Sequence, residues 1–331
     1  MPHRLFAGTP DTPLVTTAWL AEHLGADDLV VLDATVLRVT GFNGSVAYVS
    51  GEEEYLVKGH IPGAVFADLF DDFSDPEGEY AFAHPAAKHF ERAAQAHGID
   101  NDTAVVVYDT GIGTWASRLW WLFRSFGFEV RVLDGGLTKW RAEGRPLATG
   151  DVRPRRAGDF SAAHEPGAWA DKADIEAVLS GAADAVLLCA LPPREFTGEE
   201  GGRSRRGHIP TSVNVSASHL LDRQTNAYLP VERLREVFAD ATASGEPIIG
   251  YCQSAIASTS DALALALIGR TDVRIYDGSL NEWASDQTAP LEQQREPALV
   301  ARAASPTPPA AAASATSAAP SGRGRGRHSA A

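Results

Sequence analysis

The sequence predicts an α/β protein made of two similar domains in tandem, each an open, mostly parallel β-sheet flanked by helices. Short apolar runs typical of buried parallel strands alternate with stretches of helical composition, which is the pattern of such sheets. The order of these elements before residue 145 is repeated after residue 168. With 331 residues, of which 44% are hydrophobic and 22% charged, the chain is long enough for two domains of ordinary size.

The first domain is expected to span residues 13–145, after a loose N-terminal arm over residues 1–12. Its first helix begins at Thr16 or Thr17, whose hydroxyls are good helix caps, and Gly25 ends it. The elements expected after that helix are, in order, a strand over 29–33, a polar stretch with acidic residues at 52–54, a helix over 84–97, a strand over 104–108, an apolar helix over 115–126, a strand over 130–133 and a short helix opened by 134–140.

The second domain is expected to span residues 169–290, after a linker over 146–168 in which prolines and arginines gather. Its expected elements are, in order, a helix over 171–179, a strand over 185–189, a helix over 231–239, a strand over 247–251, a helix over 261–268, a strand over 273–276 and a final segment over 277–283.

Three short motifs occur once in each half and in the same order. Each half contains a Gly-His-Ile-Pro turn, a site where a buried strand runs into a loop, and an Asp-Gly-x-Leu-x-x-Trp segment. The matched pairs are Gly59–Pro62 with Gly207–Pro210, Tyr108-Asp109 with Tyr251-Cys252, and Asp134–Trp140 with Asp277–Trp283. This agreement indicates an internal duplication.

Cys252 is the candidate nucleophile. The apolar run from Pro247 to Tyr251 stops at Cys252, small and polar residues follow, and an apolar helix comes next. This order places the thiol among backbone N–H groups at a helix N-terminus, which attract an anion and favour thiolate over thiol. The competing interpretation is a packing cysteine, because free cysteines are among the most buried residues. No Cys-x-x-Cys or Cys/His ligand spacing is present, which argues against a metal or dithiol site.

The paired motifs resemble those of the tandem-domain rhodanese sulfurtransferases, which include thiosulfate and 3-mercaptopyruvate sulfurtransferases. The resemblance covers residues 13–290. It implies a catalytically silent first domain, with Asp109 at the cysteine position, and a catalytic second domain with Cys252. It also implies that sulfane sulfur moves from thiosulfate or 3-mercaptopyruvate, through a Cys252 persulfide, to a thiophilic acceptor such as cyanide or a thiol, with no cofactor or metal.

The resemblance assigns roles to further residues. N–H groups of the loop would hold the persulfide; its residues are Gln253, Ser254, Ala255, Ile256, Ala257 and Ser258. Ser254 and His60 match a proton relay of the mercaptopyruvate enzymes, although a histidine in a repeated turn is more often structural. The neutral Gln253 and Ser254 favour mercaptopyruvate over thiosulfate as donor.

Four positions depart from the family pattern. They are Ala255 for a glycine, Ala257 for an arginine, and Leu191 and Glu195 where arginines are expected. A positive φ at Ala255 would cost about 1 kcal/mol. Replacement positive charge is expected from Arg194 or from the cluster Arg203, Arg205 and Arg206, and a solvated loop is an equal alternative for these residues. Cys189, with its apolar neighbours, is expected to be a core residue.

These departures leave a second function open, a degenerate rhodanese-like protein that binds a partner or accepts a persulfide with little turnover of its own. A cysteine-loop phosphatase is disfavoured, because that chemistry needs an arginine six places after the cysteine to clamp phosphate, and residue 258 is a serine.

Residues 291–331 are expected to form a disordered tail of Ala, Pro and Ser that ends in a Gly-Arg repeat. Such a repeat can contact nucleic acid, but a short charged tail is more often a solubilising end, and the net charge of −14 repels nucleic acid. A nucleic-acid partner is therefore not expected. Only two cysteines, no signal-peptide core and no membrane-length apolar run predict a cytoplasmic protein without a membrane partner.

Overall fold

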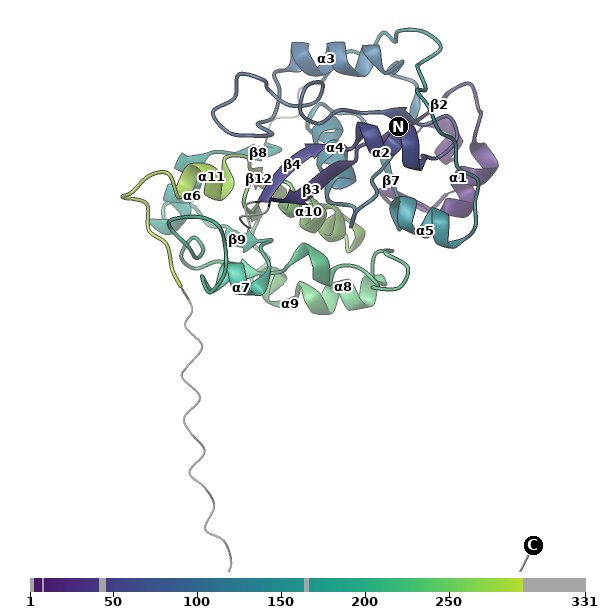
Figure 1. Ribbon diagram of the computed structural model, residues 1–331. Coiled ribbons are helices and arrows are strands. Elements are labelled where there is room, and N and C mark those ends of the chain that lie inside the picture. The colour runs from purple at the N-terminus through teal and green to yellow at the C-terminus, as the bar shows by residue number, and fades with distance from the viewer. Residues whose placement is uncertain (1–2, 8, 42–45, 164–166, 294–331) are drawn as a thin grey trace, which may run out of the picture. The chain divides into compact units, whose positions relative to one another are not determined.

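Two five-stranded parallel sheets organise the protein in a computed structural model, which describes residues 3–7, 9–41, 46–163 and 167–293 (Figure 1). The strand order is β1-β7-β6-β2-β5 in the first sheet and β8-β12-β11-β9-β10 in the second. Each strand of one sheet therefore has a counterpart at the same place in the other. The predicted α/β class with two open parallel sheets is confirmed.

The elements of the first domain are, in chain order, η1 (Arg4–Phe6), β1 (Leu14–Val15), α1 (Thr17–His23), β2 (Leu29–Asp33), β3 (Val36–Thr40), β4 (Val46–Ser50), α2 (Glu52–Lys58), β5 (Val65–Phe66), α3 (Ala87–Ala96), β6 (Ala104–Tyr108), α4 (Thr114–Ser125), β7 (Arg131–Leu133) and α5 (Gly136–Ala142).

The elements of the second domain are, in chain order, β8 (Trp169–Ala170), α6 (Lys172–Leu179), β9 (Val186–Cys189), α7 (Pro193–Phe196), β10 (Val213–Asn214), η2 (Ala217–His219), α8 (Val231–Val237), α9 (Ala239–Thr242), β11 (Ile248–Tyr251), α10 (Ala257–Leu267), β12 (Val273–Tyr276) and α11 (Ser279–Trp283).

The duplication extends to the register of the strands. Leu32 and Asp33 of β2 pair with Val65 and Phe66 of β5. Leu188 and Cys189 of β9 pair in the same way with Val213 and Asn214 of β10. Because the two sheets agree in strand order and in register, the strand that ends at Asp109 and the strand that ends at Cys252 occupy equivalent central places.

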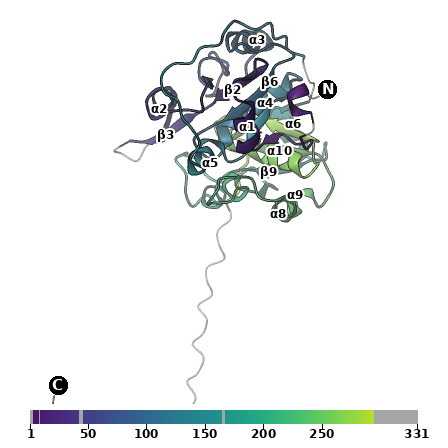
Figure 2. The same ribbon diagram turned by 90° about the vertical axis from the view of Figure 1, so that its right-hand side faces the viewer.

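The two domains meet along α4 and α10, the helices that follow those two central strands. They pack against each other and lie side by side in both ribbon views (Figures 1 and 2). One continuous apolar core includes Leu119 and Trp120 of α4 together with Leu263 and Leu265 of α10. The half of the duplication with Asp109 at the cysteine position is thus packed against the helix that follows the Cys252 loop.

Several sequence expectations need correction. The polar stretch expected before residue 59, which carries no predicted helix or strand, contains the antiparallel hairpin β3–β4 and the helix α2. The arm is not loose at Phe6, which is buried, and Phe160 of the expected linker packs into the core of the first domain. The helix expected over 231–239 is two short helices, and α10 begins at Ala257, four residues earlier than expected. The tail over 294–331 lies outside the described residues.

Strands over 29–33, 104–108 and 273–276 are confirmed with the predicted bounds. Burial on both faces explains this, because such strands are short continuous apolar runs with clear ends. No helix in the described part of the chain is long and apolar enough to cross a membrane.

Asp261 on α10 is an unusual core residue. Its side chain is 1% exposed, and neither carboxylate oxygen has a hydrogen-bond partner among the described residues. Burial raises the pKa of Asp261 well above its ordinary value of 3.8, because an isolated charge is costly in the core. The folded protein therefore keeps this proton at pH values at which the unfolded chain has released it.

The raised pKa of Asp261 makes the free energy of unfolding depend on pH. Above pH 3.8 the unfolded chain gains free energy by ionising Asp261 while the folded chain does not, so stability falls as pH rises towards the folded pKa. We expect Asp261→Asn to remove this slope and to raise the free energy of unfolding at pH 7 by about 1 kcal/mol or more. Urea unfolding between pH 4 and 8 measures it, with the exposed Asp240→Asn as control. An unchanged slope in Asp261→Asn contradicts the assignment.

Candidate active site

Cys252 lies at the end of β11, the central strand of the second sheet. β11 pairs in parallel with β9 on one side and β12 on the other. The loop 253–256 then leads into α10, and the thiol side chain is 2% exposed. Cys189, the other free cysteine, is fully buried in β9, and burial raises the pKa of its thiol to about 12. Cys252 is therefore the thiol placed at a loop, and Cys189 is the core thiol that the sequence predicted.

Ser279 holds the Cys252 loop from behind. Its Oγ accepts the backbone N–H of Cys252 at 3.2 Å and that of Ala255 at 3.1 Å, and donates to the carbonyl of Tyr276 at 2.8 Å. The N–H of Leu280 donates to the carbonyl of Cys252 at 3.1 Å. The loop after β12 thus fixes the loop after β11. One of the N–H groups expected around the sulfur, that of Ala255, is therefore already used by this serine.

Ala255 has a left-handed backbone, with φ of 56°. The expected cost of an alanine in place of the family's glycine therefore applies, at about 1 kcal/mol. Ser279 is left-handed as well, with φ of 48°, and its counterpart Gly136 in the first domain has φ of 54°. The left-handed backbone at this position is common to both halves. At the loop after the central strand the halves differ, because Ala255 is left-handed in the second half whereas in the first half it is Gly113, with φ of 80°, and not Ile112, the counterpart of Ala255.

Asp109 shows what the equivalent loop of the first domain binds. One carboxylate oxygen accepts N–H groups from Gly111 at 2.8 Å and Gly113 at 3.0 Å. The other accepts N–H groups from Trp115 and Ala116, both at 3.0 Å. Burial raises the pKa of Asp109, and these four hydrogen bonds to the carboxylate oppose that effect. We call this ring of N–H groups the anion cradle; in the first domain it is filled by the protein's own side chain.

Arg203 is the arginine of the predicted cluster that reaches the Cys252 loop. Its Nη1 donates to Oε1 of Gln253, whose amide Nε2 donates to Asn281 at 2.9 Å. Burial lowers the pKa of the Arg203 guanidinium, and the nearby Glu195 and Cys252 oppose that effect. Part of the arginine cluster predicted to replace the family's charges is therefore at the site.

The other candidate arginines have different surroundings. Arg194 is exposed and forms ion pairs with Glu199 at 3.2 Å and Glu200 at 2.6 Å. Arg205 donates to backbone carbonyls of residues 284, 286 and 289. Arg206 donates to the carbonyl of Glu199. The described contacts do not bring these three side chains to the Cys252 loop, and Arg194 is corrected to a neutralised surface residue.

His60 is buried within its own turn. Its Nδ1 lies 3.0 Å from the carbonyl of Tyr55, and its ring stacks on the Tyr55 ring at 3.9 Å. His208 repeats this arrangement with Phe196. None of the described hydrogen bonds of His60 reaches Ser254 or Cys252. These contacts therefore support a structural role for this histidine and give no support to the proton relay.

Tyr48 is a residue near the site that the sequence analysis missed. It lies on β4 and pairs with Arg38 of β3. The centroid of its ring lies 5.5 Å from that of Trp115 and 6.4 Å from that of Phe82, both in edge-to-face geometry. Burial raises the pKa of Tyr48, and the proximity of Cys252 and Glu195 adds to the rise. The hairpin of the first domain therefore stands close to the Cys252 loop. Figure 2 shows β3 extending away from the rest of its domain.

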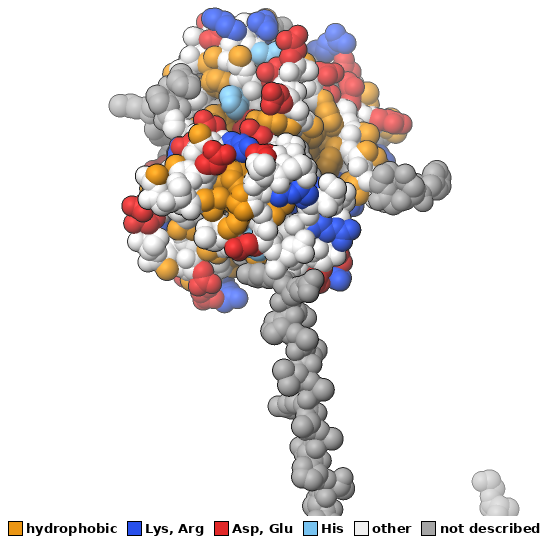
Figure 3. Space-filling view, turned by 90° about the vertical axis from the view of Figure 1, so that its left-hand side faces the viewer, with side chains coloured by type: hydrophobic (Ala, Val, Ile, Leu, Met, Phe, Trp, Pro, Cys, Tyr) orange, Lys and Arg blue, Asp and Glu red, His pale blue; other side chains and the backbone are white. Residues whose placement is uncertain are grey.

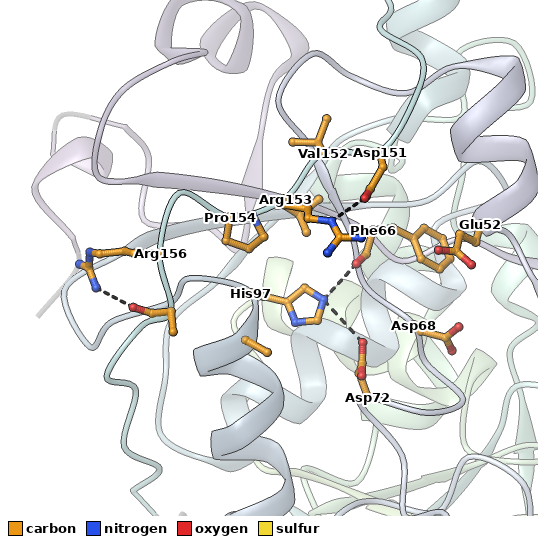
Figure 4. A pocket seen from close by; sticks show the side chains of 13 residues that line it. Glu52, Phe66, Asp68, Asp72, His97, Asp151, Val152, Arg153, Pro154 and Arg156 are labelled. Carbon is orange, nitrogen blue, oxygen red and sulfur yellow. Dashed lines mark hydrogen bonds and ion pairs between the residues drawn. The ribbon is translucent and has the colours of Figure 1, made fainter.

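A pocket of about 490 Å³ lies elsewhere in the described part of the chain. Figure 4 shows its acidic lining with His97, whose Nε2 lies 3.0 Å from the carbonyl of Phe66 and 3.8 Å from Asp72. No residue of the Cys252 loop lines it. Within the described residues no group of three His, Cys, Asp or Glu side chains is placed to hold a metal ion. Figure 3 shows apolar side chains lining a hollow on another face, with acidic side chains around it.

Comparison with known proteins finds the same duplication. A family model described as a rhodanese-like domain matches the chain twice, at residues 16–143 and 179–286. The chain is 34% identical over 284 residues to a putative thiosulfate sulfurtransferase of Mycobacterium tuberculosis, covering 84% of this chain and 96% of that protein.

Two further similarities, one in sequence and one in structure, are to a 3-mercaptopyruvate sulfurtransferase of Escherichia coli. The chain is 33% identical over 285 residues to the 3-mercaptopyruvate sulfurtransferase of Escherichia coli, covering 85% of this chain and 98% of that protein. The crystal structure of the Escherichia coli enzyme SseA superposes with a TM-score of 0.71 at 31% identity, covering 81% of this chain and 98% of that one.

The four hydrogen bonds to Asp109 in the anion cradle predict that this residue contributes to the stability of the protein. Asp109→Ala leaves four buried N–H groups without an acceptor, and each unpaired donor costs about 1–3 kcal/mol. We expect the free energy of unfolding to fall by about 3 kcal/mol or more. Urea titration measures the loss against the exposed Asp102→Ala. A loss as small as that of the control contradicts the assigned role of Asp109.

Proposed function

This chain belongs to the rhodanese family and is a sulfurtransferase, and we propose that it carries sulfane sulfur on Cys252. The family and the fold that the repeated motifs predicted are confirmed. The donors we propose are 3-mercaptopyruvate and thiosulfate, the compounds after which the relatives are named. The neutral side chains of Gln253 and Ser254 favour 3-mercaptopyruvate. The acceptor is a thiol or cyanide.

The reaction has two half-reactions. The Cys252 thiolate attacks the thiol sulfur of 3-mercaptopyruvate or the sulfane sulfur of thiosulfate, so that a new S–S bond forms while the donor's C–S or S–S bond breaks. The electron pair leaves with pyruvate enolate, which then takes up a proton, or with sulfite. The acceptor next attacks the outer sulfur of the persulfide, and the S–S bond breaks to return the Cys252 thiolate. Atoms and charges balance without a metal or an organic cofactor.

The observation that carries this proposal is the carboxylate of Asp109 in the anion cradle of the first domain. By the repeat, the N–H groups of Ser254, Ile256 and Ser258 correspond to those that bind Asp109 from Gly111, Gly113 and Trp115. The sulfur of Cys252 lies one bond closer to the backbone than the carboxylate oxygens of Asp109 do. The outer sulfur of a Cys252 persulfide adds that bond and extends the side chain towards these N–H groups. Donors fixed in advance stabilise a negative charge without a reorganisation cost.

Arg203 is proposed as the residue that attracts the donor. Thiosulfate and 3-mercaptopyruvate are both anions, and Arg203 is the arginine held against the loop by Gln253. A guanidinium binds a carboxylate or a sulfur oxyanion through parallel N–H bonds. This charge takes the place of those missing at Leu191, Glu195 and Ala257.

A persulfide-accepting module with little turnover is the second candidate. It differs from the main proposal in rate and not in chemistry, since both use Cys252. The cytoplasm stays the proposed location, on the strength of two cysteines that are both free thiols.

Cys252→Ser should remove sulfur transfer from both donors, because a hydroxyl cannot carry the sulfane sulfur. Wild-type protein incubated with 3-mercaptopyruvate should gain the mass of one sulfur atom on Cys252. Intact-mass spectrometry and thiocyanate release measure the two effects, with Cys189→Ala as the matched control that keeps both. Turnover that survives in Cys252→Ser would falsify the proposal, and a persulfide without turnover favours the accepting module.

Arg203→Met should raise KM for both anionic donors by about tenfold, since a charge-assisted hydrogen bond contributes roughly 1.5–3 kcal/mol. The exposed Arg206→Met is the control and should keep the wild-type KM. Steady-state kinetics with varied donor concentration separates KM from kcat. Equal kinetics in Arg203→Met and Arg206→Met would rule out Arg203 as the anion-binding residue.

A further inference from the structure

Arg118 of the first domain is buried at the domain interface and reaches into the second domain. It lies on α4 and is 1% exposed. Its Nη2 donates to Oδ1 of Asp277 at 2.8 Å and to the carbonyl of Phe82 at 2.5 Å. Its Nη1 donates to the carbonyl of Ala255 at 3.3 Å, and its guanidinium stands over the Trp169 ring at 4.8 Å. A buried cation requires such pairing, and Asp277 supplies the opposite charge.

The contact with Ala255 falls on the strained residue of the Cys252 loop. A left-handed alanine persists only where its surroundings hold it. The N–H of Ala255 is held by Ser279 and its carbonyl by Arg118. Both peptide groups that flank the strained torsion are therefore tied, one from within the second domain and one from the first.

The contact with Asp277 joins the same two loops again. Asp277 follows β12 and precedes Ser279 by two residues, and its second oxygen accepts the N–H of His84 at 2.8 Å. Arg118 thus links the loop after β12, which carries Ser279, to the loop after β11, which carries Cys252. A shift of this guanidinium would move both supports of the cysteine loop.

We propose that Arg118 is a positioning residue for sulfur transfer, through which the cysteine-less domain sets the conformation of the Cys252 loop. The guanidinium holds the carbonyl of Ala255, which fixes the left-handed turn and with it the direction of the N–H groups around the sulfur. This proposal rests on the proposed function of Cys252. It adds that the first domain is required for that function and does more than cover the second.

The contact between Arg118 and the cysteine loop has no equivalent in the other half of the duplication, so it is not a simple consequence of the repeat. The counterpart of Ala255 in the first domain is Ile112, a residue 45% exposed, and the cradle there is filled by Asp109. The counterpart of Arg118 in the second domain is Asp261, which has no hydrogen-bond partner among the described residues. Arginine at this position serves only the loop that carries the cysteine.

The test compares Arg118→Met with Arg131→Met. Arg131 is a matched control because it is also buried, also stands over an aromatic ring (Phe6, at 4.3 Å) and also donates to backbone, but lies on β7 away from Cys252. Melting temperature, steady-state sulfur transfer and the rate of Cys252 alkylation between pH 5 and 10 are measured for each. Alkylation reports the state of the thiol without any sulfur donor.

We expect Arg118→Met to lower kcat about tenfold or more, because a small misplacement of a reacting group has effects of that size. We expect the midpoint of its alkylation profile to move up by about one pH unit, as N–H groups turn away from the sulfur. Arg118→Lys, which keeps a donor and the charge opposite Asp277, should recover part of both effects. Arg131→Met should melt earlier than wild type with an unchanged alkylation profile.

Wild-type values of kcat and of the alkylation midpoint in Arg118→Met, within about twofold, overturn the proposal. If Arg118→Met does not fold, Arg118→Lys and Asp277→Asn decide in its place, and unchanged profiles in both overturn it. If the wild type transfers no sulfur from either donor, the proposed function fails while the alkylation profiles still decide the role of Arg118. A shift of equal size in Arg131→Met also overturns it, because the effect would then be a general loss of stability.

Discussion

A ring of backbone N–H groups at the end of the central strand is the constraint on which both halves of this protein depend. Such groups are strong donors, and leaving them buried without an acceptor is costly. The first domain meets this demand with its own carboxylate, since Asp109 accepts four of them. In the second domain Cys252 takes that position, and Ser279 accepts the N–H groups of Cys252 and Ala255. One fold therefore gives a cradle filled by a carboxylate in one copy, and we propose that the other copy offers its remaining N–H groups to a persulfide.

The first domain contacts the Cys252 loop because of the way the two domains pack. Because α4 and α10 form the interface, the helix that starts at the filled cradle packs against the helix that starts at the cysteine loop. Arg118 lies on the first of these helices, and the hairpin residue Tyr48 stands close to Cys252. The first domain thus has no cysteine at this position, and we propose that it serves as a scaffold for the loop that carries Cys252.

The sequence predicted best what depends on local pattern. Buried strands such as 104–108 are continuous apolar runs, and the duplication followed from short motifs with fixed spacing. It failed at β3–β4, because a two-stranded hairpin with exposed valines has no buried face to impose a period. It could not choose between Arg194 and the cluster Arg203, Arg205 and Arg206, because which arginine of a polar segment turns inward depends on tertiary contacts, and of these Arg203 reaches the loop. Arg118 looked like one more residue of an apolar helix.

The contacts around the Cys252 loop change what the departures from the family pattern imply for its function. Ala255 carries the cost of a left-handed turn, but Ser279 and Arg118 tie it on both sides, so the strain is held where it directs the loop. Leu191 is a buried core residue, and Arg203 supplies positive charge beside Gln253. A degenerate loop would be expected to lose its supports together with its charges. Here the loop keeps its supports in Ser279 and Arg118 and gains one positive charge from Arg203, which favours a working loop of altered specificity over an inactive remnant.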